Sequence, residues 1–142
     1  MSSWKRIAIS LFPEHRFGYF GFQQPHMTIY QIFFELQDDV KEFVKNRNQE
    51  GVERIFRYVN WCFAQRYRAH DIWNAAATAF VEHLADDDEL TNLIPLWIKP
   101  EIFEDMWDEF EKRRERKGKG KFKELVGHYN RENLTNYVFE KK

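Results

Sequence analysis

The sequence predicts a mainly all-α protein, a compact bundle of about five helices built from helical hairpins. Apolar residues recur at spacings of three and four in several successive segments, as on the buried face of a helix. The joints between these segments are short and polar. The chain has 142 residues, of which 43% are apolar and 18% aromatic, so it can bury a core without disulfides. We therefore expect residues 1–142 to form a single helical domain.

Residues 1–27 are expected to form an aromatic N-terminal arm, irregular or with short strands, that covers the core. Their aromatic side chains favour burial, whereas Gly18, Gly21 and Pro25 favour irregular backbone. The first residues carry two positive charges and only a brief apolar run that ends at Pro13. This pattern is too short for a signal peptide.

The next two segments predict an antiparallel helical hairpin. Thr28 is a suitable N-cap, and an apolar stripe with helical spacing follows it over residues 29–44. A polar joint at residues 46–48 separates this stripe from a second one over residues 52–63. Consecutive amphipathic helices with so short a joint pack side by side.

The rest of the chain predicts further helices and one loop. Asp71 is expected to cap a third helix over residues 72–84, whose run of alanines allows another helix to approach closely. The acidic residues 86–89 are expected to cap a short helix that Pro95 ends. Pro100 suits the first turn of a fourth helix over residues 100–111. Residues 112–123 are expected to form a basic mobile loop, and a last helix or strand pair follows.

The charges are strongly segregated although the net charge is only −1. Residues 80–111 carry a net charge of −10, and residues 112–123 carry +7. The acidic block predicts either a solvated helix face or a docking surface for a basic protein partner. The candidate partner-binding residues are Asp86, Asp87, Asp88, Glu89, Glu101, Glu104, Asp105, Asp108 and Glu109.

The sequence predicts no catalytic constellation and no cofactor. The glycines match neither of the two phosphate-binding patterns, G-x-x-x-x-G-K-S/T and G-x-G-x-x-G. Cys62 lies between Trp61 and Phe63, which indicates a small core residue. The alternative enzyme is a metal-dependent hydrolase that uses the dipeptide His70-Asp71, as metal phosphohydrolases of the HD type do. His83 near Asp86 lacks a second histidine at helical spacing, which disfavours a metal site there.

A second alternative is a nucleic-acid accessory protein that uses the basic segment 112–123. Lysine and arginine clusters bind phosphate backbones, but only Phe122 adds an aromatic ring, and the sequence pI is about 6.5. Nucleic acid is therefore the less favoured partner. The absence of a long apolar segment argues against a membrane span, and one cysteine fits the reducing cytoplasm. A homodimer is a further option for the assembly of this chain.

Residues 74–84 (NAAATAFVEHL), residues 93–97 (LIPLW) and the helix after Pro100 carry a resemblance to known proteins. Residues 28–114 resemble a family of small all-helical bacterial proteins, some of which are associated with toxin–immunity loci. The resemblance implies a cytoplasmic immunity protein that neutralises a cognate toxin by tight binding. The toxin would be a basic protein, and a nuclease is one option. It rests on a packing pattern, so it implies no site residue.

Overall fold

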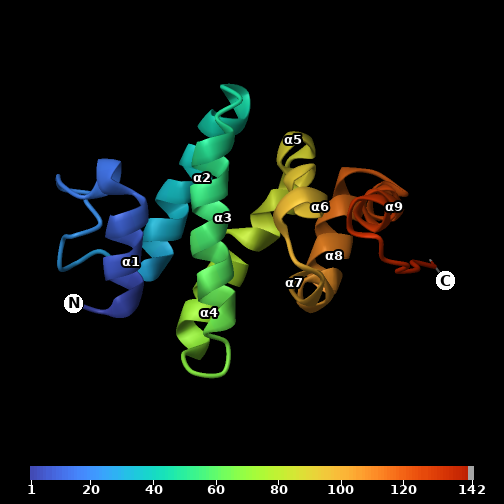
Figure 1. The fold of residues 1–142 in the computed structure, drawn as a ribbon. Coiled ribbons are helices and arrows are strands. Elements are labelled where there is room, and N and C mark those ends of the chain that lie inside the picture. The colour runs from blue at the N-terminus through green and yellow to red at the C-terminus, as the bar shows by residue number, and fades with distance from the viewer. Residues whose placement is uncertain (141–142) are drawn as a thin grey trace. The chain divides into compact units, whose positions relative to one another are not determined.

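The structure is a computed structural model that describes residues 1–140. All its regular elements within that range are helices, which confirms the all-α prediction. The helices are shorter and more numerous than the expected bundle of about five (Figure 1). The chain divides into two compact units, Met1–Phe80 and Val81–Lys142. No helix in the described range has the length and apolar character needed to cross a lipid bilayer.

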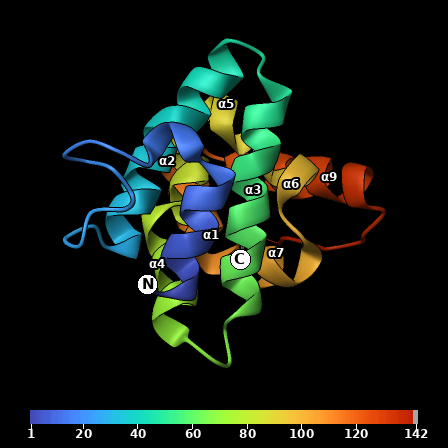
Figure 2. The same cartoon turned by 60° about the vertical axis from the view of Figure 1, so that its left-hand side comes forward.

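The Met1–Phe80 unit is built on the predicted helical hairpin. Its elements are α1 (Ser3–Leu11), the 3-10 turn η1 (Pro13–His15), α2 (Ile29–Lys45), α3 (Gln49–Ala64) and α4 (His70–Ala79). Helices α2 and α3 lie side by side, α4 packs against both, and α1 packs mainly against α3 (Figures 1 and 2). Thr28 caps α2 as predicted, since it accepts the amide of Gln31 while the Gln31 side chain accepts the amide of Thr28.

Buried aromatic rings form the core of this unit. Phe33 and Phe56 each contact Phe80, with centroids 5.9 Å apart in both pairs. Tyr58 packs against Phe33 at 5.4 Å, and its hydroxyl donates a hydrogen bond of 2.9 Å to the carbonyl of Trp4. The hydroxyl thus joins α1 to α3 in an otherwise apolar interior.

The N-terminal arm was predicted wrongly. Residues 3–11 form helix α1, and no strand occurs within residues 1–27. Its buried side chains, Lys5 and Ala8, are three residues apart on one helical face. So short a helix gives a weak periodic signal, which the following glycines and prolines obscure. Phe12 and Phe22 are buried, as expected for a covering segment.

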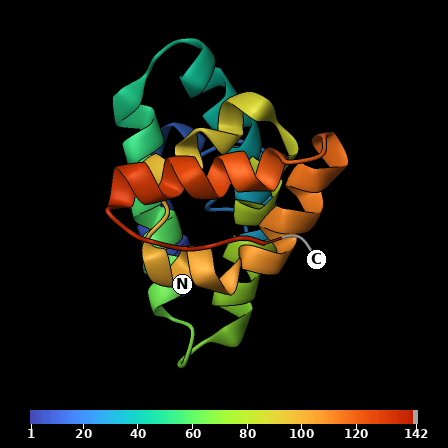
Figure 3. The same ribbon diagram turned by 90° about the vertical axis from the view of Figure 1, so that its right-hand side faces the viewer.

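The Val81–Lys142 unit consists of short helices around a second core. They are η2 (Val81–Asp86), α5 (Asp88–Thr91), α6 (Leu93–Trp97), α7 (Pro100–Asp105), α8 (Trp107–Lys117) and α9 (Lys121–Asn133). Helix α9 packs on α6 and α8 (Figure 3). Phe103 and Tyr129 stack at 3.9 Å, and the Tyr129 hydroxyl donates to the carbonyl of Ile98 at 2.7 Å. These contacts bring α7 and α9 together.

Several predicted boundaries differ from those observed. The third helix ends at Ala79 rather than residue 84, and Asp71 lies in its first turn, after the N-cap Ala69. Pro95 lies inside α6 instead of ending a helix.

The predicted basic mobile loop over residues 112–123 is also wrong. Helix α8 continues to Lys117, where its basic residues suit the negative end of the helix dipole, and α9 begins at Lys121. Only residues 118–120 join the two helices. Gly120 has a φ of 86°, in the left-handed region that favours glycine.

Candidate functional site

The predicted acidic residues all lie in the Val81–Lys142 unit, where they separate into two groups. The first group, on η2 and α5, comprises Asp86, Asp87, Asp88 and Glu89. The second group, on α7 and α8, comprises Glu101, Glu104, Asp105, Asp108 and Glu109. The two groups have different surroundings, so they are described separately.

Arg113 binds carboxylates from both groups. Its Nη1 lies 2.7 Å from Asp86, its Nη2 lies 2.9 Å from Glu82, and its Nε lies 3.3 Å from Glu109. Burial opposes ionisation of Asp86, but hydrogen bonds from His83 and Arg113 outweigh it and hold the pKa of Asp86 below its ordinary value. Asp86 and Glu109 are thus already engaged within the protein.

Asp87 and Asp88 also have structural partners. The side chain of Asp87 caps α5, since it accepts the amides of Glu89 at 2.8 Å and Leu90 at 3.1 Å. Asp88 accepts a hydrogen bond of 2.8 Å from Arg114, which lowers the pKa of the Asp88 carboxyl. Charge reversal at these two residues would therefore disturb the fold as well as any binding surface.

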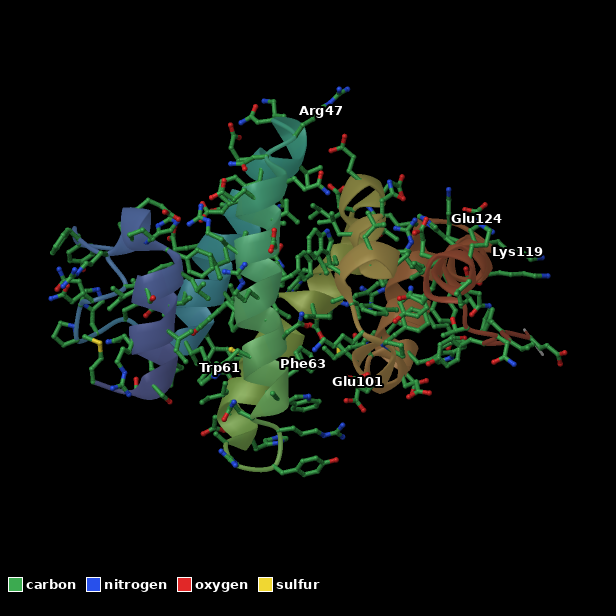
Figure 4. All side chains as sticks on the ribbon, in the orientation of Figure 1. Arg47, Trp61, Phe63, Glu101, Lys119 and Glu124 are labelled. Carbon is green, nitrogen blue, oxygen red and sulfur yellow. The ribbon has the colours of Figure 1, made fainter. Side chains whose placement is uncertain are left out.

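The second group borders a groove that the sequence did not predict. Its lining residues are Glu104, Trp107, Asp108, Tyr137 and Val138, and its volume is about 480 Å³. The side chains of Glu104 and Asp108 are exposed. Glu101 and Asp105 are exposed on α7, the same helix as Glu104, and Figure 4 shows the Glu101 side chain extending away from its helix. We call this feature the acidic–aromatic groove.

Two aromatic rings form the wall of the acidic–aromatic groove. Trp107 packs edge-on against Phe122 with centroids 4.9 Å apart and lies 5.9 Å from Tyr137. Burial and a hydrogen bond to Glu104 raise the pKa of Tyr137, so its hydroxyl stays a neutral donor to that carboxylate. The arrangement combines negative charge with ring faces.

The C-terminal segment reaches the groove because Asn130 holds it there. Helix α9 ends at Asn133, its C-cap Leu134 has a left-handed φ of 54°, and the chain then turns back. The Asn130 side chain donates to the carbonyl of Tyr137 at 2.8 Å and accepts its amide at 3.0 Å. The sequence gives little indication that Tyr137 faces the protein, because the only pattern that suggests it is the alternation of Tyr137 and Phe139 with their neighbours.

The alternative enzymatic residues are exposed. His70 and Asp71 lie in the first turn of α4, and the His70 ring packs 5.2 Å from Trp73. Within residues 1–140, no three or more His, Cys, Asp or Glu residues are grouped as metal ligands would be. Cys62 is buried, and burial raises the pKa of its thiol, which suits the predicted core position.

A second surface that sequence reasoning missed lies between η1 and α2. Phe17, Tyr19 and Phe20 are each at least 66% exposed, although their ring size had predicted burial. Hydrogen bonds nevertheless order this loop: the amide of Phe22 donates to the His15 carbonyl at 2.7 Å. An ordered loop with exposed rings is typical of an interaction surface.

Comparison with known proteins identifies a family but no activity. The sequence model of a family described as a domain of unknown function, DUF7674, matches residues 6–115. This range includes the groove residues Glu104 and Asp108 and ends before Tyr137. No curated protein and no solved structure matches the chain.

Proposed function

We propose that this chain, which belongs to the DUF7674 family, is a non-enzymatic protein-binding module whose acidic–aromatic groove receives a basic side chain of a partner. The observation that carries the proposal is the lining of the groove. The exposed carboxylates of Glu104 and Asp108 lie beside the rings of Trp107 and Tyr137. Carboxylates attract lysine and arginine, and aromatic faces attract the same cations.

The surroundings of the groove favour a basic protein over a small cation. Glu101 and Asp105 extend the negative surface along α7, and both are exposed. Such a surface accelerates encounter with a positively charged partner and fixes its orientation. The groove provides the central anchor and the flanking carboxylates provide the rim.

A more specific proposal is that the partner is a basic toxin domain, which this protein neutralises as an immunity protein. Its support is the charge of the surface together with the resemblance of residues 28–114 to a family of small all-helical proteins, some of which are associated with toxin–immunity loci. Inhibition of this kind requires tight binding but no chemistry on the part of the inhibitor.

The test uses two double variants with equal changes in charge. Glu104→Lys with Asp108→Lys alters the groove, whereas Asp38→Lys with Glu42→Lys alters exposed carboxylates at the same spacing on α2. Partners that co-purify with the native chain are identified by mass spectrometry, and their affinity for each variant is then measured. We expect the groove variant to weaken binding at least about tenfold and the α2 variant to retain it.

Circular dichroism checks that both variants are folded. Equal binding by the native chain and a folded groove variant would contradict the proposed docking site. If the basic partner proves harmful when expressed alone, co-expression of the native chain should suppress the harm and the groove variant should not. Suppression by both would show that the toxin is bound elsewhere.

A further inference from the structure

A second hollow in the Val81–Lys142 unit has the opposite chemical character. Its volume is about 410 Å³, within the range of small-molecule sites. It lies among α5, α8 and α9. The charged or titratable residues that line it are Asp88, Arg114, Lys121, Glu124, His128 and Arg131.

Helix α9 supplies most of the positive charge from one face. Lys121 and Arg131 carry this charge, and His128 lies between them on the same stripe of the helix. Within residues 1–140, no salt bridge engages Arg131. Glu124, labelled in Figure 4, is 73% exposed and lies 3.8 Å from Lys121, so it can turn toward solvent.

Arg114 provides a fixed guanidinium in this pocket. Only 4% of the residue is exposed, and the carbonyl of Ala85 at 3.1 Å and Asp88 at 2.8 Å hold two of its nitrogens. Its Nε is buried and has no acceptor among the described residues. A planar guanidinium held in place by its neighbours is well suited to binding phosphate oxygens.

We propose that this pocket binds the phosphate group of a small phosphorylated metabolite. Arg114 compensates the charge of Asp88, and Lys121 and Arg131 then outnumber Glu124. The pocket is larger than one phosphate ion, which leaves room for an organic group beside the polar side chain of Thr91 and the apolar one of Leu125. This site is independent of the acidic–aromatic groove.

The test is a titration of the full chain at constant ionic strength, followed by backbone amide NMR. The ligands are inorganic phosphate, glucose 6-phosphate and adenosine monophosphate, with glucose and adenosine as unphosphorylated counterparts. We expect saturable shifts at Thr91, Lys121, Leu125 and His128 with the phosphorylated compounds only. Stronger binding of one ester than of inorganic phosphate would support the proposal and identify the organic group. Binding of inorganic phosphate without binding of either ester would contradict a metabolite site and indicate a free-ion site.

Arg114 is unsuitable for substitution because its burial links it to folding. Lys121→Gln with Arg131→Gln removes two pocket charges, and Lys119→Gln with Arg116→Gln removes two exposed charges that do not line the pocket. Because the pocket variant loses charge-assisted hydrogen bonds to the phosphate group, it should raise the Kd more than about tenfold. Absence of saturable shifts, or equal weakening in both variants, would overturn the proposal.

Discussion

At the scale of single residues, His15 connects the loop that carries the exposed aromatic rings to helix α2. Its Nε2 bonds to the carboxylate of Asp39, and its ring stacks on Phe22 with centroids 4.7 Å apart. The hydrogen bond to Asp39 raises the pKa of His15, against the opposing effect of burial, and the charges of Asp39, Glu14 and Glu35 add to the rise. The charged imidazole is therefore the form that the folded protein favours.

The raised pKa predicts that this contact stabilises the protein most at lower pH. A histidine whose pKa is higher in the folded state contributes its full stabilisation below the unfolded value of 6.5. That contribution is lost as the pH rises through the raised folded pKa. The difference in thermal stability between the native chain and His15→Gln should be largest below pH 6.5 and should shrink as the pH rises above that value. A constant difference across this range would contradict the prediction.

Two glycines should respond to alanine in opposite directions. A Cβ at Gly21 would lie 2.5 Å from the carbonyl oxygen of Arg16 and 2.7 Å from the carbonyl carbon of Phe17, so the loop backbone would have to move. Gly127 lies within α9, where the nearest atom to an added Cβ is 3.5 Å away. We expect Gly21→Ala to lower the free energy of unfolding by about 1–3 kcal/mol and Gly127→Ala to raise it by about 0.5–1 kcal/mol. Chemical denaturation measures both, and stabilisation by Gly21→Ala would be inconsistent with the ordered loop.

At the scale of elements, one arginine joins η2 to α8. Arg113 lies between Glu82, Asp86 and Glu109, and its side chain is 14% exposed. Replacement by methionine keeps the apolar stem but leaves these carboxylates without their shared partner. Because Asp86 and Glu109 are partly exposed, we expect a loss of about 2–3 kcal/mol, below the cost for a fully buried pair.

Lys112→Met is the matched control for Arg113→Met. Lys112 forms an ion pair with Glu109 at 3.0 Å, and its side chain is 53% exposed. Its loss should change stability by less than about 0.5 kcal/mol. Equal effects of the two substitutions in urea denaturation would argue against the role assigned to Arg113.

The C-terminal segment depends on another single side chain. Asn130 bonds to both backbone groups of Tyr137 and accepts the Thr135 hydroxyl at 2.8 Å. Asn130→Ala should therefore release Tyr137 from the groove and speed exchange of its amide hydrogen, while α9 stays folded. Asn136→Ala, at an exposed neighbouring position, should leave that exchange unchanged. Unaltered protection of Tyr137 in Asn130→Ala would contradict the proposed tether.

At the scale of the whole molecule, the division into two compact units predicts separable local stability. Each of Met1–Phe80 and Val81–Lys142 has its own set of packed aromatic rings. Destabilisation of one core should therefore open that unit preferentially. In Arg113→Met, we expect faster hydrogen exchange across residues 81–140 and little change across residues 1–80. Uniformly faster exchange would indicate a single cooperative unit.

The helices that were predicted correctly are those whose signals are local along the chain. The stripes over residues 29–44 and 52–63 predicted α2 and α3 within a few residues, and Thr28 was recognised as the cap of α2. Spacings of three and four residues and an N-cap are properties of one helix, so neighbours along the chain suffice to specify them. The segregation of acidic and basic residues was equally evident from the sequence, because it is found by counting charged residues in each segment.

Which residues meet, and which remain at the surface, depends on long-range packing. Asp88 and Arg114 are far apart in the sequence, yet they form an ion pair. Asp88 had been predicted to bind a partner and Arg114 to lie in a loop, but both stabilise the fold. Tyr137 reaches the groove because Asn130 reverses the chain after α9. Phe22 is buried while Phe17 is exposed, although both are the same amino acid in one glycine-rich segment. Residue type gives the tendency to be buried, but long-range packing determines which of several equivalent side chains finds a partner.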